Sequence, residues 1–358
     1  MMMSEIVLKF QKKDNTESEL VFEPDDDVFD LSKQGIISID LSPLKNAEAI
    51  KELNLGANKI EEIDLSPLTG LETLEVLNLF KNKLVEINLT PLESCVNLLE
   101  LNLGQNEIQE IDLTPLASCS QLTRLRLFSN QIEYIDITAL ADCEKLEALE
   151  LENNGFSEID LRPLAGCPNL VQLNLMYNAL AELDLTHLKR CKELKFLYLH
   201  HNTLTSIDLT PLENCTKLKI LRLGSNELES IDLGPLSKCI RLRRLGLAMN
   251  QLEFISLEPL STCTRLRSLD IAGNSIDEID LSPLGKCVEL EELYLFSDHP
   301  EENTFDTIDL TQLFNCPELE DLGLPIDAEL VAKESKKRQK DKPIALEDLI
   351  EERRITWI

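Results

Sequence analysis

The side chains with the most reactive chemistry in this sequence of 358 residues are ten cysteines. Nine of them, from Cys95 to Cys287, lie 24 residues apart, and the tenth is Cys316. A zinc site needs several converging thiolates, typically through a CxxC spacing, and the sequence contains no CxxC. The cysteines instead occupy the repeat position at which Ala47 and Leu71 stand earlier in the chain. We therefore predict buried, reduced thiols rather than a metal site or a disulfide framework.

Carboxylates and histidines are the next candidates for chemistry. Calcium needs several oxygen ligands per ion, and one aspartate per repeat supplies too few, so we expect these aspartates to accept hydrogen bonds from nearby backbone N–H groups. His200 and His201 are the only adjacent histidines, and consecutive residues of a strand point to opposite sides, so they would chelate one ion only beyond the strand's end. The aspartates in phase are Asp40, Asp64, Asp112, Asp136, Asp160, Asp184, Asp208, Asp232, Asp280 and Asp309.

The sequence lacks the common catalytic motifs. We find no nucleophile elbow GxSxG, no phosphate loop GxxxxGK[ST], no HExxH and no glycine-rich dinucleotide loop. The prediction is a chain that is not an enzyme, with no catalytic residue, no metal and no cofactor.

These residues keep step with a repeat of 24 residues. Leucines recur at that spacing from Leu53 to Leu293, and asparagines follow five residues later from Asn58 to Asn274, until Asp298 takes their place. In the repeat LLELNLGQNEIQEIDLTPLASC, apolar and polar residues first alternate, which predicts a short strand with one buried face. The asparagine then stands at a bend, where its amide can satisfy backbone groups of its own and neighbouring coils.

The second half of each repeat predicts a helical turn. Thr114 precedes Pro115, which suits a hydroxyl N-cap before a proline at the first helical position. Leu116, Cys119 and Leu122 then form an apolar stripe on the opposite side of the coil from the strand.

The pattern LxxLxLxxNxL, repeated in phase from about Phe29 to Leu324, resembles the leucine-rich-repeat superfamily. The chain is similar to its intracellular SDS22-like members, and the LSPL or LTPL segment with its cysteine also resembles BspA-like repeats. The resemblance implies an α/β solenoid, a curved horseshoe with a parallel β-sheet on the concave face and short helical or 3-10 turns on the convex face. It also implies a non-enzymatic scaffold or regulatory subunit that binds a protein on its concave face.

Three parts are expected along the chain. Residues 1–28 should form a capping β-hairpin, and residues 29–321 twelve repeats of 24 residues, the last extended by an insertion at 297–306. Residues 322–358 should add a final strand and a helical cap, with helical patterns over 328–342 and 345–354 and a buried Trp357.

Arginine and aromatic residues gather on the predicted concave face, at the positions directly before, directly after and three after the strand leucine. Such residues are enriched in protein interfaces. The alternative is structural: aromatic rings stack on one another and arginines pair with Glu150 and Glu152. Tyr294 and Phe296, beside the insertion, form a secondary candidate site. The primary candidates are Arg124, Arg126, Phe128, Glu150, Glu152, Met176, Phe196, Tyr198, His200, Arg222 and Arg244.

Charge limits the class of partner. With 35 Lys and Arg against 65 Asp and Glu, the formal charge of −30 disfavours a nucleic acid, and no apolar run is long enough for a membrane span. We expect a protein partner of unknown identity and favour a monomer. The alternatives are a glycan or small ligand on the aromatic face, or a GTPase or phosphatase regulator that supplies Arg222 or Arg126 in trans.

Reduced cysteines and no recognisable secretion signal predict the cytoplasm, with the nucleus as the alternative.

Overall fold

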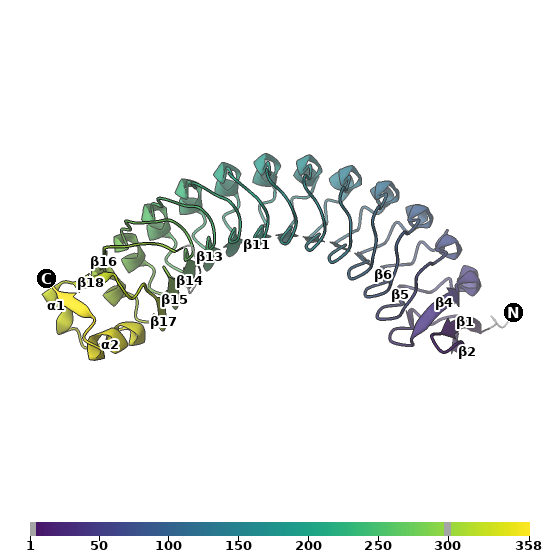
Figure 1. Ribbon diagram of the computed structural model, residues 1–358. Coiled ribbons are helices and arrows are strands. Elements are labelled where there is room, and N and C mark those ends of the chain that lie inside the picture. The colour runs from purple at the N-terminus through teal and green to yellow at the C-terminus, as the bar shows by residue number, and fades with distance from the viewer. Residues whose placement is uncertain (1–4, 297–301) are drawn as a thin grey trace. The chain divides into compact units, whose positions relative to one another are not determined.

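The computed structural model describes residues 5–296 and 302–358, and the chain divides into two compact units, residues 1–178 and 179–358. Both units repeat one coil, which consists of a three-residue strand, a bend and a 3-10 helix. In each unit the strands lie on the inner side of the coils and the 3-10 helices on the outer side (Figure 1). The predicted solenoid, with a parallel sheet on one side and short turns on the other, is therefore confirmed within each unit.

The strands of each unit pair in parallel, with every strand leucine beside the leucine of the next coil, for example Leu101 beside Leu125. In the first unit the sheet runs in the order β3 (Val28–Asp30), β5 (Glu52–Asn54), β6 (Val76–Asn78), β7 (Glu100–Asn102), β8 (Arg124–Arg126), β9 (Ala148–Glu150) and β10 (Gln172–Asn174). In the second unit the order is β11 (Phe196–Tyr198), β12 (Ile220–Arg222), β13 (Arg244–Gly246), β14 (Ser268–Asp270), β15 (Glu292–Tyr294) and β17 (Asp321–Gly323).

Two smaller sheets stand apart from these strands. In the first unit, β1 (Ile6–Lys12) pairs antiparallel with both β2 (Glu17–Phe22) and β4 (Ile36–Asp40). In the second unit, β16 (Thr307–Asp309), β18 (Glu329–Ala332) and β19 (Ile355–Trp357) pair in parallel.

The turns on the outer side are 3-10 helices, and at ten of them an aspartate rather than a threonine accepts a hydrogen bond from the first helical N–H; Asn88 does so at η3, and Ser256 stands at this position before η10. The first residue of η4 is Thr114, so the predicted N-cap role of Thr114 is wrong. Asp112 Oδ1 accepts a hydrogen bond from the Thr114 N–H at 2.9 Å. Every other aspartate of the predicted set likewise accepts a hydrogen bond from the backbone N–H of the residue two positions after it. The helices are η1 (Ser42–Asn46), η2 (Ser66–Leu68), η3 (Thr90–Ser94), η4 (Thr114–Ser118), η5 (Thr138–Asp142), η6 (Arg162–Gly166), η7 (Thr186–Arg190), η8 (Thr210–Asn214), η9 (Gly234–Lys238), η10 (Glu258–Thr262), η11 (Ser282–Lys286) and η12 (Thr311–Asn315).

The repeated asparagines join neighbouring coils, as predicted. Asn106 Oδ1 accepts the N–H of Leu84 in the preceding coil, and its Nδ2 donates to the carbonyls of Leu79 and Leu103. After Asn274 this role passes to Asn303, whose Oδ1 accepts the Ile276 N–H at 2.9 Å. Asp298, which the period of 24 selects, lies outside the described residues. The insertion thus shifts the period and leaves the hydrogen bonding intact.

All ten cysteines are buried, free thiols, as predicted. Each of several thiols donates a weak hydrogen bond to a carbonyl of the preceding coil, as Cys119 Sγ does to Leu92 O at 3.5 Å. Burial raises the pKa of Cys119 and Cys191 to about 12. These thiols are therefore part of the core and are chemically unreactive at neutral pH.

The C-terminal segment differs from the prediction in two respects. Residues 329–332 form strand β18, where a helix was predicted over 328–342, and the first helix there, α1 (Glu334–Lys337), is a single turn. The second pattern gives α2 (Ile344–Glu351). Trp357 is half-buried, so the prediction of a buried Trp357 is wrong. Its ring lies 6.0 Å from that of Phe314, and the Lys337 ammonium lies over it. In the described part of the chain, no helix combines the length and the apolar character that a membrane span requires.

We predict that Asn106→Ala lowers the free energy of unfolding by roughly 3 kcal/mol, because the buried Leu84 N–H and two carbonyls lose their partner. Asn102→Ala in the same repeat is the control. Its amide accepts only the local Gly104 N–H and is half-buried, so a loss of less than about 1 kcal/mol is expected. Equal losses in chemical denaturation would contradict the proposed role of the asparagines.

We further predict that a thiol reagent such as DTNB at pH 8 modifies none of the ten cysteines within minutes in the folded protein, and all ten after denaturation. Ser157→Cys, at an exposed position, should add one rapidly reacting thiol and so show that the reagent is active. Rapid labelling of native wild-type protein would show that the cysteine column is accessible.

Candidate protein-binding surface

The surface in question is the open face of each sheet, defined as the residues directly before, directly after and three after the strand leucine. Strand pairing brings equivalent residues of neighbouring coils side by side, at about 4.8 Å per strand. In the first unit the open face contains six of the predicted site residues: Arg124, Arg126, Phe128, Glu150, Glu152 and Met176. In the second unit it contains seven: Phe196, Tyr198, His200, Arg222, Arg244, Tyr294 and Phe296.

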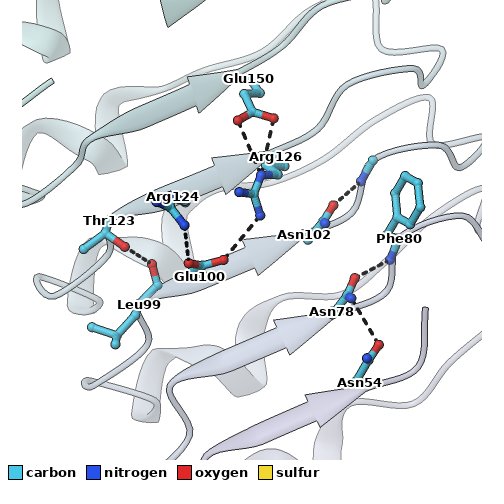
Figure 2. Close-up of polar contacts among 11 residues, drawn as sticks. Asn54, Asn78, Phe80, Leu99, Glu100, Asn102, Thr123, Arg124, Arg126 and Glu150 are labelled. Carbon is cyan, nitrogen blue, oxygen red and sulfur yellow. Dashed lines mark hydrogen bonds and ion pairs between the residues drawn. The ribbon is translucent and has the colours of Figure 1, made fainter. Parts of the chain in front are cut away.

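The arginines of the first unit are neutralised by carboxylates on the strands beside them. Arg124 Nη1 lies 2.8 Å from Glu100 Oε1, and Arg126 lies 3.3 Å from carboxylate oxygens of both Glu100 and Glu150. Figure 2 shows Arg126 between these two carboxylates. Glu100 was absent from the predicted set, although it precedes Arg124 by one repeat. The structural alternative holds for this part of the face, with Glu100 in the place predicted for Glu152.

The aromatic residues of the first unit also satisfy one another. The Phe128 ring lies 5.9 Å from that of Phe80, two strands away. Gly104 stands between them, and a Cβ atom there would come within 2.5 Å of the Phe128 ring. Because glycine alone leaves room for this contact, Phe128 covers the sheet and is held in place by it. Asn78 joins this arrangement by donating to Asn54 Oδ1 and accepting the Phe80 N–H (Figure 2).

Glu152 is the anomaly of the first unit. Its Oε2 is buried and makes no hydrogen bond with any described residue. Burial raises the pKa of Glu152 to about 7; the nearby Glu150 carboxylate contributes in the same direction, and Arg126 opposes it. A large fraction of Glu152 is therefore protonated at neutral pH.

The second unit presents a different arrangement. Arg222 and Arg244 are exposed, and neither guanidinium has an ion-pair or hydrogen-bond partner among the described residues. Strand register puts Arg222 beside the half-buried Tyr198, and Arg244 lies one strand further on, opposite Ile220. Burial raises the pKa of Tyr198, and the positive charges of Arg222 and Arg244 oppose that rise. In the described part of the chain, the predicted arginine–glutamate pairing is therefore not found for Arg222 and Arg244, and the negative charge that acts on Arg222 is that of Asp270 on β14.

His200 and His201 follow the end of β11, so their rings are free to approach and lie 5.4 Å apart. The His200 ring also packs edge-on against Tyr198 at 6.2 Å. Burial lowers the pKa of His200 to about 4, helped by His201 and Arg222, so His200 is neutral at physiological pH. Within the described residues, no group of three or more His, Cys, Asp or Glu side chains is placed to hold a metal ion.

The secondary candidates turn toward the last strand of their sheet. Tyr294 Oη donates to Asp321 Oδ2 at 3.3 Å, and a Cβ on Gly323 would lie 3.0 Å from the Tyr294 ring. Phe296 is half-buried beside it.

Sequence reasoning missed a groove along the side of the first unit. The groove is strongly acidic, and its lining contains no Lys or Arg. It follows the repeat, so its signals in the sequence are the glutamates at 62, 86 and 110 and the in-phase aspartates Asp64 and Asp112. Its lining is Glu62, Ile63, Asp64, Glu86, Ile87, Asn88, Gln109, Glu110, Ile111, Asp112, Gln131, Glu133 and Tyr134.

We predict that Glu152→Gln stabilises the protein increasingly as pH rises from 5 to 8. The folded-state pKa of about 7 lies above the ordinary 4.5, so the stability contributed by the protonated carboxyl is fully present below pH 4.5 and is lost as pH rises through 7. The amide never ionises, so the variant should gain on the order of 1–2 kcal/mol over wild type between these pH values, after allowance for solvent contact. Thermal denaturation at both pH values measures the difference.

The control for this prediction is Glu150→Gln, which weakens the ion pair with Arg126 and should destabilise the protein at pH 8. A pH-independent difference between wild type and Glu152→Gln would mean that Glu152 ionises normally.

Comparisons with known proteins come to the same fold. Family models described as leucine rich repeat match residues 72–132, 120–180, 192–252 and 265–287, which together cover more than half of the chain. The search of curated protein sequences gave no match. The SDS22-like and BspA-like resemblances find no support beyond the superfamily level.

Solved structures similar to the chain are leucine-rich-repeat proteins of diverse function. The internalin InlF of Listeria monocytogenes is 24% identical, with a TM-score of 0.63 and coverage of 86% of this chain and 90% of that one. The functional domain of InlJ from the same organism, which includes a cysteine ladder, is 23% identical (TM-score 0.65, coverage 85% and 64%). The plant peptide hormone receptor RGFR1, solved with RGF2, is 23% identical (TM-score 0.72, coverage 85% and 48%). These identities establish the fold alone, and with the family matches they show that the chain belongs to the leucine-rich-repeat family.

Proposed function

We propose that this chain is a non-enzymatic protein-interaction module that binds its partner on the open face of the second unit. The observation that carries the proposal is the pair of uncompensated guanidinium groups, Arg222 and Arg244, beside the half-buried rings of Phe196 and Tyr198. Arginine and tyrosine are among the residues that contribute most to binding energy at interfaces. This surface therefore offers a partner the positive charge and N–H donors of the arginines beside the apolar area of the two rings.

The contrast between the two units supports this choice of surface. Arg124 and Arg126 already pair with Glu100 and Glu150, so a partner would have to compete with existing ion pairs there. Arg222 and Arg244 form no ion pair with any described residue, and Asp270 on β14 is the carboxylate whose charge Arg222 feels. The proposed binding site consists of Phe196, Tyr198, Arg222 and Arg244, with His200 as a neutral neighbour. Arg124, Arg126, Phe128, Glu150, Glu152 and Met176 lie outside it, on the open face of the first unit.

Similar structures favour binding over catalysis without fixing the ligand class. RGFR1 was solved with RGF2, the ectodomain of the plant receptor kinase GASSHO1/SCHENGEN3 with CASPARIAN STRIP INTEGRITY FACTOR 2, and TLR13 with ssRNA13. For the present chain, the net charge of −30 favours a protein over an RNA. We further propose a monomer that works in a reducing compartment such as the cytoplasm, where ten free thiols persist.

The test is capture of partners from a native lysate by wild-type protein and by the double variant Arg222→Glu, Arg244→Glu. The control is Arg241→Glu, Arg265→Glu, which changes the charge equally at exposed positions on turns after η9 and η10. Circular dichroism first establishes that all three proteins fold. We expect wild type and control to retain the same protein and the double variant to lose at least nine-tenths of it. Equal retention by all three would exclude this face as the binding surface.

A further inference from the structure

The open face of β11, β12 and β13 is a cationic area in a strongly acidic protein. Its residues include Arg222 and Arg244 and no carboxylate, whereas the whole chain has 65 acidic against 35 basic residues. His200 adds no charge, since burial lowers its pKa to about 4. The net charge of this area is therefore set by the two guanidinium groups.

Strand register places the two arginines on neighbouring strands in a diagonal relation. Arg244 lies opposite Ile220, and Arg222 lies opposite Gly246. The Arg222 side chain passes over that glycine, because its Cγ lies 3.8 Å from where a Gly246 Cβ would stand. Tyr198 lies opposite Arg222 on its other side, so Tyr198, Arg222 and Gly246 form one row across β11, β12 and β13. Two forked guanidinium groups at this spacing suit carboxylates, with which arginine forms paired hydrogen bonds.

Several open-face side chains of this area are very small. Gly224 follows β12, Gly246 ends β13 and Ala248 follows it, and all three occupy open-face positions. Apart from the Arg222 Cγ, nothing lies within 4 Å of a Cβ placed on Gly246. The open space therefore lies over Gly246 on β13, on the side of Arg222 away from Tyr198, and an extended peptide backbone can approach the sheet closely there.

Carboxylates limit the area on the side of β14 and β15. Asp270 and Glu292 hold open-face positions on these strands. Burial raises the pKa of Asp270, and the negative charges of Glu302 and Glu292 raise it further, whereas the positive charge of Arg222 lowers it. Three carboxylates therefore lie close together at this border. A long acidic segment would be repelled at this border, so the anionic part of a ligand must be short.

We propose that the partner presents a short acidic protein segment, one or two carboxylate side chains next to an aromatic or apolar residue, to Arg222 and Arg244. This inference rests on the proposed function, because it names the chemistry of the partner at the same surface. The carboxylates pair with the guanidinium groups, and the apolar residue packs on Phe196 and Tyr198. Asp270 and Glu292 restrict the length of the acidic stretch.

The test uses fluorescein-labelled synthetic peptides and fluorescence polarisation with the full-length protein. The peptides share the sequence GSGSYxxGSGS, in which xx is Glu-Glu, Gln-Gln or Lys-Lys, and a fourth peptide contains ten glutamates. We expect the Glu-Glu peptide to bind at least tenfold more tightly than the Gln-Gln and Lys-Lys peptides at 50 mM salt, and to lose most of this advantage at 500 mM.

Variants separate electrostatic recognition from general damage. Arg222→Ala, Arg244→Ala should weaken Glu-Glu binding at least tenfold, and Arg241→Ala, Arg265→Ala by less than twofold. Gly246→Ile fills the space above Gly246 without changing the charge, and it should also weaken binding of the Glu-Glu peptide. Glu292→Gln should strengthen binding of the ten-glutamate peptide severalfold, a gain that a damaged fold cannot produce.

Equal binding of the Glu-Glu and Gln-Gln peptides, or Glu-Glu binding unaffected by loss of both arginines, would overturn the inference. Preference for an anionic oligosaccharide such as hexagalacturonate over the Glu-Glu peptide would assign the surface to glycans and overturn it as well. If lysate capture still depends on Arg222 and Arg244 in these cases, the protein-interaction function stands and only the acidic segment is wrong.

Discussion

The direct stacking of each coil on the next is the constraint on which the rest of the structure depends. Because Leu101 lies beside Leu125 and the register continues strand by strand, each side chain has its equivalents from the adjacent coils as neighbours. Buried backbone groups must then find partners across that stack. The asparagine amides and cysteine thiols do this on opposite sides of the core, and aspartates accept a hydrogen bond at the exposed start of most 3-10 helices.

The same stacking decides which open-face residues are available for binding. Residues one repeat apart are neighbours, so Glu100, Arg124 and the adjoining Arg126 and Glu150 neutralise one another. Phe80 and Phe128, two repeats apart, meet because the residue between them is Gly104. Arg222 and Arg244 have no carboxylate on the open face of β11 to β13 and so remain open to other molecules. Binding capacity on this sheet therefore depends on the order of repeats as well as on their composition.

Much of the fold follows from the sequence because one period governs it. The strands, the asparagine bonds and the buried cysteines were predictable from spacing, as each depends only on its place in a 24-residue unit. What was not predictable involves either local competition or side-chain reach. Asp112 takes the capping role from Thr114 because its carboxylate reaches the Thr114 N–H, and residues 329–332 form a strand because β16 offers a parallel edge, although their composition suits a helix.

The candidate site was predictable in membership and unpredictable in its internal pairing. Sequence alignment of the repeats placed Arg124, Arg126, Arg222 and Arg244 on one face. The partners of Arg126 depend on lateral reach to Glu100 and Glu150, and Glu152 Oε2 nearby accepts no hydrogen bond from a described residue. The shift of the asparagine role to Asn303 depends on how many residues the insertion adds, which a fixed period does not reveal.

The direction of the asparagine hydrogen bonds has a consequence for the order in which the chain is made. The Leu84 N–H donates to Asn106, and the Leu204 N–H donates to Asn226, so each acceptor lies 22 residues further along the chain than its donor. A ribosome synthesises the acceptor after the donor, so the newest coil of a nascent chain always carries a buried amide whose partner does not yet exist. Folding during translation therefore follows synthesis one repeat behind, and a chain that stops early ends in an incomplete coil.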